Sequence, residues 1–63
     1  MTLNTLFYAC SDMDFTSTFV LADLLDDMKI KVFDSWYDIP EEEKERYVSS
    51  FSFSDGEWYI CVR

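Results

Sequence analysis

The chain has 63 residues, with 13 Asp and Glu against five Lys and Arg, so its formal net charge is −8. This length predicts one compact domain over residues 1–63. The acidic charge argues against direct binding to nucleic acid or to an anionic membrane. No apolar run approaches the roughly 18 residues of a membrane span, and no secretory signal is recognised, so a cytoplasmic protein is expected.

The first two elements are expected to be a strand and then a helix. Residues 3–10 are rich in aromatic and apolar side chains and end at polar residues, which predicts a strand. The main helix is predicted from about Phe15 to Met28, because apolar residues recur there at i, i+3, i+4 and i+7. This predicted stripe consists of Leu21, Leu24, Leu25 and Met28.

A second strand and a short helix are expected next. Residues 29–33 alternate between charged and apolar side chains, which predicts a strand. Residues 34–39 are ambiguous. A short polar helix is predicted from Asp38 to about Val48, since Asp38 can cap it and Pro40 is tolerated in a first turn. Glu42 and Arg46 are expected to form an i, i+4 ion pair on it.

A β-hairpin is predicted from Phe51 to Val62, with its turn at Asp55-Gly56, because a type I′ turn needs positive φ at both central positions. The predicted register places Phe53 opposite Trp58, with an apolar face and a serine-bearing face. The predicted apolar face consists of Phe51, Phe53, Trp58, Ile60 and Val62.

These elements give an α+β fold in the order strand, helix, strand, short helix, strand, strand. We expect a small, mostly antiparallel sheet of three to four strands, with the main helix packed on one face. The open edges of such a sheet would also allow a homodimer.

Catalytic and ligand-binding signatures are absent from the sequence. There is no His, which removes the commonest general base and metal ligand, and a single Gly excludes a phosphate-binding loop. We therefore expect no enzyme activity, no cofactor and no metal site. Cys10 and Cys61 are both placed in predicted strands and are expected to be reduced, with a bridge between them as the less favoured alternative. An acid-dependent enzyme or a weak metal binder remains a minor hypothesis, which calorimetry with Ca²⁺ and Mg²⁺ would test.

The arrangement of the acids is the most informative feature of the sequence. Asp23, Asp26 and Asp27 share one face of the predicted main helix, and no Lys or Arg occurs before Lys29. Three Asp residues lower helix propensity where Glu would have kept it, so a binding role is slightly favoured over a merely solvated face. Phe19 would stand beside these acids as an aromatic anchor, although burial under the following chain is the favoured interpretation for that ring.

Two further groups are candidates for partner binding, each with a simpler alternative. Trp36 and Tyr37 lie beside Asp34 and Asp38 and repeat the combination of aromatic rings with carboxylates; burial of the rings is the alternative. In the glutamate cluster a solvated helix face is the favoured interpretation. Its candidate contacts are Glu41 and Glu42.

These features predict a small acidic interaction protein that blocks the basic nucleic-acid-binding surface of a partner protein, an enzyme or complex. In size and charge, though in no motif, the chain resembles the DNA-mimic inhibitors that bacteriophages use against host defence, such as anti-CRISPR, anti-restriction and repair-nuclease inhibitors. The resemblance implies action in the host bacterial cytoplasm. The alternative is an accessory subunit or antitoxin-like protein that binds its partner through the hairpin edge and exposed aromatic residues.

Overall fold

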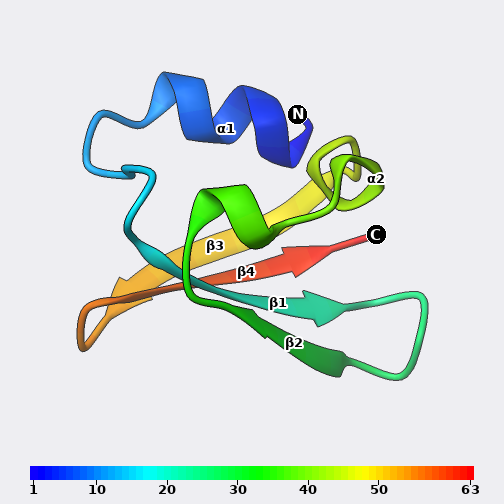
Figure 1. Cartoon of the computed structure of the whole chain (residues 1–63). Coiled ribbons are helices and arrows are strands. Elements are labelled where there is room, and N and C mark those ends of the chain that lie inside the picture. The colour runs from blue at the N-terminus through cyan, green and yellow to red at the C-terminus, as the bar shows by residue number, and fades with distance from the viewer.

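The computed structural model describes all 63 residues as one sheet with its helices on one face (Figure 1). The elements in chain order are α1 (Leu3–Ala9), β1 (Thr18–Asp23), β2 (Lys29–Phe33), the 3₁₀-helix η1 (Trp36–Asp38), α2 (Glu41–Lys44), β3 (Val48–Ser54) and β4 (Glu57–Val62). The fold is therefore α+β, as predicted. No helix has the length and apolar character needed to cross a membrane.

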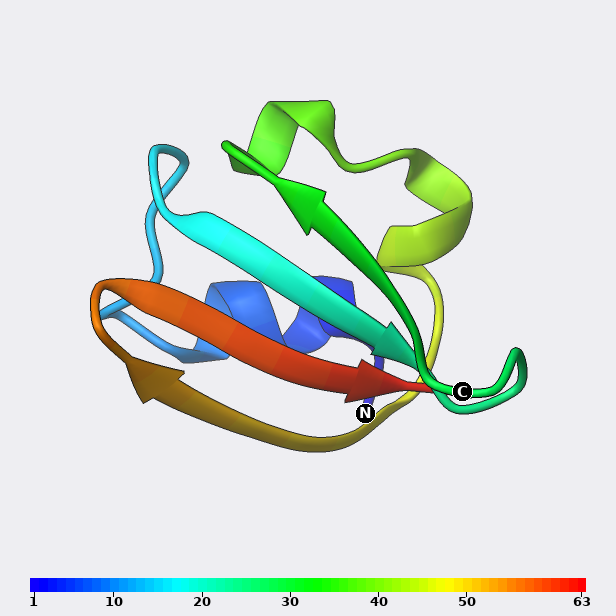
Figure 2. The ribbon, with the colours of Figure 1, turned by 90° about the horizontal axis from the view of Figure 1, so that it is seen from below.

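The sheet is mixed and has the strand order β2-β1-β4-β3. Two antiparallel hairpins, β1–β2 and β3–β4, lie side by side, and the parallel pairing of β1 with β4 joins them. The helices lie above this sheet in Figure 1, and the view from below in Figure 2 shows the other face without a helix in front of it. The molecule thus has one covered face and one open face.

The prediction of a strand at residues 3–10 is wrong, because these residues form α1 and Cys10 is its C-cap. Leu3, Leu6 and Phe7 stand at i, i+3 and i+4, and all three are buried against the sheet. The Thr2 side chain accepts a hydrogen bond from the backbone N–H of Thr5, which satisfies one free donor at the helix start. Three apolar residues at helical spacing outweighed the general β propensity of the segment.

The prediction of the main helix from Phe15 to Met28 is also wrong, because this segment contains β1 and the loop to β2. In β1, Phe19 and Leu21 are buried beneath the helices, while Val20 and Ala22 point to the open face. This alternation is typical of a strand in a sheet. The apolar residues at helical spacing were misleading, since Leu24, Leu25 and Met28 are exposed in the loop.

The C-terminal hairpin is confirmed in its register and its turn. Phe53 pairs with Trp58, and Asp55 and Gly56 both have positive φ, at 53° and 79°. Trp58 is buried as expected. However, Phe51 and Phe53 are about half exposed, because β3 is an edge strand that the helices do not cover.

The predicted strand at Lys29–Phe33 is confirmed as β2, but the predicted helix from Asp38 to about Val48 is much shorter. Only α2 is α-helical there, Pro40 rather than Asp38 is its N-cap, and no side chain caps it. Tyr47 is bridged to Thr2, and Val48 begins β3. The strand pairing of these residues is incompatible with a continued helix.

Aromatic stacking closes the covered side of the core. The rings of Phe7 and Trp36 are stacked with centroids 3.9 Å apart, and Phe19 contacts Trp36 edge-on at 5.6 Å. The Lys44 ammonium lies 4.7 Å from the centroid of the Trp36 ring. These contacts hold α1, η1 and α2 together over the sheet.

Candidate interaction surface

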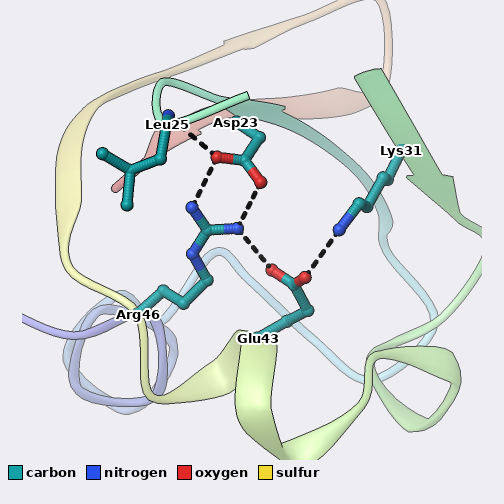
Figure 3. A network of polar contacts seen from close by, with 5 residues as sticks. All are labelled: Asp23, Leu25, Lys31, Glu43 and Arg46. Atoms are coloured by element: carbon teal, nitrogen blue, oxygen red, sulfur yellow. Dashed lines mark hydrogen bonds and ion pairs between the residues drawn. The ribbon is translucent and has the colours of Figure 1, made fainter. Parts of the chain in front are cut away.

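A network of four charged side chains lies between α2 and the end of the β1–β2 hairpin (Figure 3). Arg46 donates to both carboxylate oxygens of Asp23, at 2.7 Å and 2.5 Å, and donates at 3.2 Å to Glu43. Glu43 also accepts a 2.8 Å hydrogen bond from Lys31. The two-pronged contact fixes the guanidinium in one plane with the Asp23 carboxylate.

The network shifts the ionisation of its members. The Arg46 guanidinium, helped by the Leu25 backbone N–H, lowers the pKa of Asp23 from 3.8 to about 2. Burial opposes ionisation of Glu43, but hydrogen bonds from Lys31 and Arg46 outweigh it and lower its pKa. Hydrogen bonding to Glu43 raises the pKa of Lys31. All four groups are charged at neutral pH.

The ion pairs use most of the positive charge in the chain. Lys31, Lys44 and Arg46 are all bound to carboxylates of the same molecule, and only Lys29 and Arg63 have no acidic partner. Asp23, Glu41 and Glu43 are the acids that these pairs occupy. The other ten of the 13 acidic side chains have no ion pair.

Six of the unpaired acids come from segments that adjoin the end of the sheet where β1 and β4 begin. The loop before β1 and the β3–β4 turn lie on the left of Figures 1 and 2, and the segment after β2 is tied to that loop by a backbone hydrogen bond from Trp36 to Phe15. We call this region the acidic end; it comprises Asp12, Asp14, Asp34, Asp38, Asp55 and Glu57. These residues come from the loop before β1, the segment after β2 and the β3–β4 turn. Lys29 and Lys31 lie at the start and in the middle of β2, and no Lys or Arg forms an ion pair with these six acids. The Lys44 ammonium comes near this region, where it contacts the Trp36 ring, but its carboxylate partner is Glu41.

An exposed aromatic pair lies among these carboxylates. The Phe15 and Tyr37 rings are stacked with centroids 5.0 Å apart, and Tyr37 is 74% exposed. The Trp36 backbone N–H donates to the Phe15 carbonyl at 3.0 Å, which ties the two segments together. Tyr37 therefore presents a supported ring beside Asp34 and Asp38.

The loop before β1 is ordered by its own side chains. The Asp14 carboxylate accepts hydrogen bonds from the Thr16 hydroxyl at 2.7 Å and from the Thr16 backbone N–H at 2.8 Å. These bonds, with a weaker one from Ser17, lower the pKa of Asp14. The local turn presents Asp14 in a fixed, ionised form.

Three predicted partner contacts are not accessible. Phe19 and Trp36 are buried in the core, and Asp23 is 8% exposed and bound to Arg46. For Phe19 and Trp36 the structure bears out the simpler interpretation, burial of the ring. Asp23 shares no helix face with Asp26 and Asp27, because it ends a strand and they lie in the loop that follows.

The remaining predicted contacts are exposed but lie in two places. Asp34, Tyr37 and Asp38 are brought together at the acidic end. Asp26 and Asp27 occupy the β1–β2 loop at the opposite end, and the predicted contacts of α2 lie on that side as well (Figure 1). Those contacts are Glu41, which is paired with Lys44, and Glu42, which has no partner.

Sequence reasoning missed both Arg46 as the partner of Asp23 and the contribution of Asp12, Asp14, Phe15, Asp55 and Glu57. Arg46 and Asp23 are 23 positions apart, so only the folded chain brings them together. The sequence predicts Asp55 only as a turn residue. The position of Asp55 and Glu57 beside the loop before β1 follows from the parallel pairing of Thr18 with Glu57.

The comparisons with known proteins give no family. No protein-family model, curated protein or solved structure matches the chain significantly. No pocket is found in the molecule, and no three potential metal ligands cluster. Cys10 and Cys61 are half-buried free thiols without a bridge. The candidate site is therefore a surface, defined by its charge and its exposed rings.

Proposed function

We propose that this protein is a small, non-catalytic inhibitor that binds, through its acidic end, the basic nucleic-acid-binding surface of a partner protein. The observation that carries the proposal is the exposed Phe15–Tyr37 pair among carboxylates that form no ion pair, at one end of the sheet. Inhibitors of this DNA-mimic type would act in the host bacterial cytoplasm against defence or repair enzymes.

The chemistry of such a surface suits a cationic channel. Carboxylates held at the ends of strands and in hydrogen-bonded turns present negative charge at fixed positions, as a row of phosphates does. The long-range field of a charge of −8 accelerates approach to a basic partner. Tyr37 supplies apolar area that can be buried at the contact, and aromatic residues of this kind commonly dominate binding energy.

Two charge-matched variants test the proposal. The acidic-end variant carries Asp12→Asn, Asp34→Asn, Asp38→Asn and Asp55→Asn, and none of these four side chains makes a hydrogen bond or an ion pair. The opposite-end variant carries Asp26→Asn, Asp27→Asn, Glu42→Gln and Glu45→Gln. Both change the formal charge from −8 to −4, so a difference between them reports position rather than total charge.

The assay is displacement of a fluorescent DNA duplex from a purified panel comprising a restriction endonuclease, a CRISPR effector and a repair nuclease. We expect the wild-type protein to displace DNA from at least one enzyme, with an affinity that falls as salt rises. The acidic-end variant should lose at least tenfold in affinity and the opposite-end variant much less. Absence of displacement across the panel, or equal losses in both variants, contradicts the proposal.

A second candidate function is supported by the exposed edge of the sheet. Phe51 and Phe53 are about half exposed on β3, whose outer edge has no strand partner. An accessory subunit or antitoxin-like protein could bind its partner there by adding a strand to this edge and burying the two rings. Phe51→Ser would then abolish binding, while changes of salt and of the acidic end would have little effect.

A further inference from the structure

The open face of the sheet is unusually apolar for so acidic a protein. β1 and β2 place Val20, Ala22, Ile30 and Val32 on this face, as their mutual pairing shows. Ile30 and Val32 are 56% and 58% exposed, and no helix covers them (Figure 2). An exposed apolar patch of this kind typically marks a contact surface.

The face divides into strips that follow the strands. β2 and β1 form an apolar half. β4 contributes Tyr59 and Cys61, and β3 contributes only serines, at positions 50, 52 and 54. The Tyr59 hydroxyl donates a 2.8 Å hydrogen bond to the Glu57 carboxylate, two residues earlier on the same strand.

The strip that follows β4 has one charged residue at each of its ends. Glu57 begins the strand, and Arg63 follows its end. Arg63 exchanges two backbone hydrogen bonds with Tyr47, at 2.9 Å and 3.3 Å, so the strand alternation that places Glu57, Tyr59 and Cys61 on the open face extends to Arg63. Charges of opposite sign thus stand at opposite ends of one strip.

We infer that the open face binds a second copy of this chain, in a two-fold dimer whose axis lies between the two sheets and runs across the strands. That operation places every strand over its own counterpart in the reverse direction. Apolar strips then face apolar strips, serines face serines, and Glu57 of each copy faces Arg63 of the other. A two-fold axis along the strands would instead set the serines of β3 over Ile30 and Val32 of β2.

The size of the face sets the strength of the contact. Four strands about 4.8 Å apart and about six residues long have a footprint on the order of 400 Å². This is roughly half of the 800 Å² per partner that a standard interface buries. The dimer must also bring together two molecules of formal charge −8. We therefore expect micromolar to millimolar dissociation, and tighter association at high salt, where the mutual repulsion is screened.

Sedimentation velocity over a concentration series, at low and high salt, measures this equilibrium directly. Val32→Lys should weaken the dimer tenfold or more, because the two-fold axis introduces two unpaired ammonium groups into one apolar contact. Tyr8→Lys is the matched control: Tyr8 is exposed on α1, on the covered side of the sheet, so this change should leave association unaffected.

A charge swap tests the orientation of the dimer. Glu57→Arg alone and Arg63→Glu alone should each weaken association, whereas the double variant should restore it, because the formal charge returns to −8 and the opposite signs face each other again. Far-UV circular dichroism verifies that each variant is folded. A protein that remains monomeric up to millimolar concentration, or a dimer that Val32→Lys leaves intact, overturns the inference. A dimer lost in both single swaps and not restored in the double variant overturns the proposed orientation.

Discussion

At the end of the sheet where β1 stops, an ion-pair network forms: Asp23 and Glu43 are both held by Arg46, and Lys31 completes it, although Asp26 and Asp27 in the adjoining loop have no ion pair. At the end where β1 begins, Asp12, Asp34 and Asp55 have no partner at all. The hairpin loops at the two ends also differ in which residues adopt positive φ. The β3–β4 turn uses Gly56 for one of its positive φ values, whereas the β1–β2 loop places Asp27 and Met28 in that conformation. The ion pairs of Lys31 and Arg46 thus stabilise the fold at the end where β1 stops. The carboxylates of the acidic end form no ion pair and are available to a partner.

The largest effect on stability is expected from breaking the bound end. Arg46→Gln leaves Asp23 and Glu43 side by side without their shared cation, and should lower the free energy of unfolding by about 2–3 kcal/mol. Urea denaturation followed by the fluorescence of the two buried Trp residues measures this. Lys29→Gln removes the same charge from an unpaired side chain and should change stability by less than about 0.5 kcal/mol. Equal effects in both variants would mean that the network contributes nothing.

Acid should act on the same network. The folded pKa of Asp23, about 2, lies below its ordinary 3.8, so the stability that its ionised form contributes is complete above pH 3.8 and is lost as the pH falls toward 2. The lowered pKa values of Asp14 and Glu43 act in the same direction. In Asp23→Asn, stability should fall less steeply over this range, as urea midpoints measured from neutral to acid pH would show. A slope equal to that of the wild type would contradict the assignment.

The two turns should respond in opposite senses to exchanging Gly with a larger residue. In Gly56→Ala, the added Cβ meets no neighbouring atom, but a residue with a side chain must adopt the positive φ of this turn. The variant should therefore be less stable by about 1 kcal/mol. Met28→Gly relieves the same conformation at φ 59° in an exposed residue and should stabilise by up to about 1 kcal/mol. Thermal melts of the two variants measured together test this; a loss of stability in Met28→Gly would show that its side chain contributes packing.

The smallest effect on stability is expected at the acidic end itself. The variant with four Asp→Asn changes there should be as stable as the wild type or more stable by a few tenths of a kcal/mol, since only mutual repulsion is removed. Its melting temperature should also depend less on salt. A clear destabilisation would show that these carboxylates support the fold, and would weaken the assignment of this end to partner binding.

The contrast between the two hairpins explains what the sequence could reveal. The β3–β4 register was predictable because Asp55-Gly56 fixes the turn and both strands alternate around it. The β1–β2 loop has no such signal, and its Leu24, Leu25 and Met28 imitate a helical stripe although they are exposed. The i, i+3, i+4 spacing of Leu3, Leu6 and Phe7, capped by Thr2, was a readable helix signal that the aromatic content of the segment obscured.

The candidate surface was only partly predictable for a related reason. Asp34, Tyr37 and Asp38 are neighbours in sequence, so their grouping was visible. The loop that holds Asp12 meets their segment through the antiparallel pairing of β1 with β2, and Asp55 joins them through the parallel pairing of β1 with β4; no local pattern encodes either contact. The neutralisation of Asp23 by Arg46 depends on the same long-range arrangement. Local turns and spacing therefore predict the hairpins, while the position of one hairpin against the other determines the charge map.

That central pairing also has a kinetic consequence. Thr18 meets Glu57, 39 positions further along the chain, whereas each hairpin closes through a short loop of its own. Hairpins form within microseconds, but contacts between distant segments are slow because a long loop must close first. Docking of the two hairpins should limit the folding rate. Until it occurs, the inner edges of β1 and β4 are unpaired and open to the wrong partner.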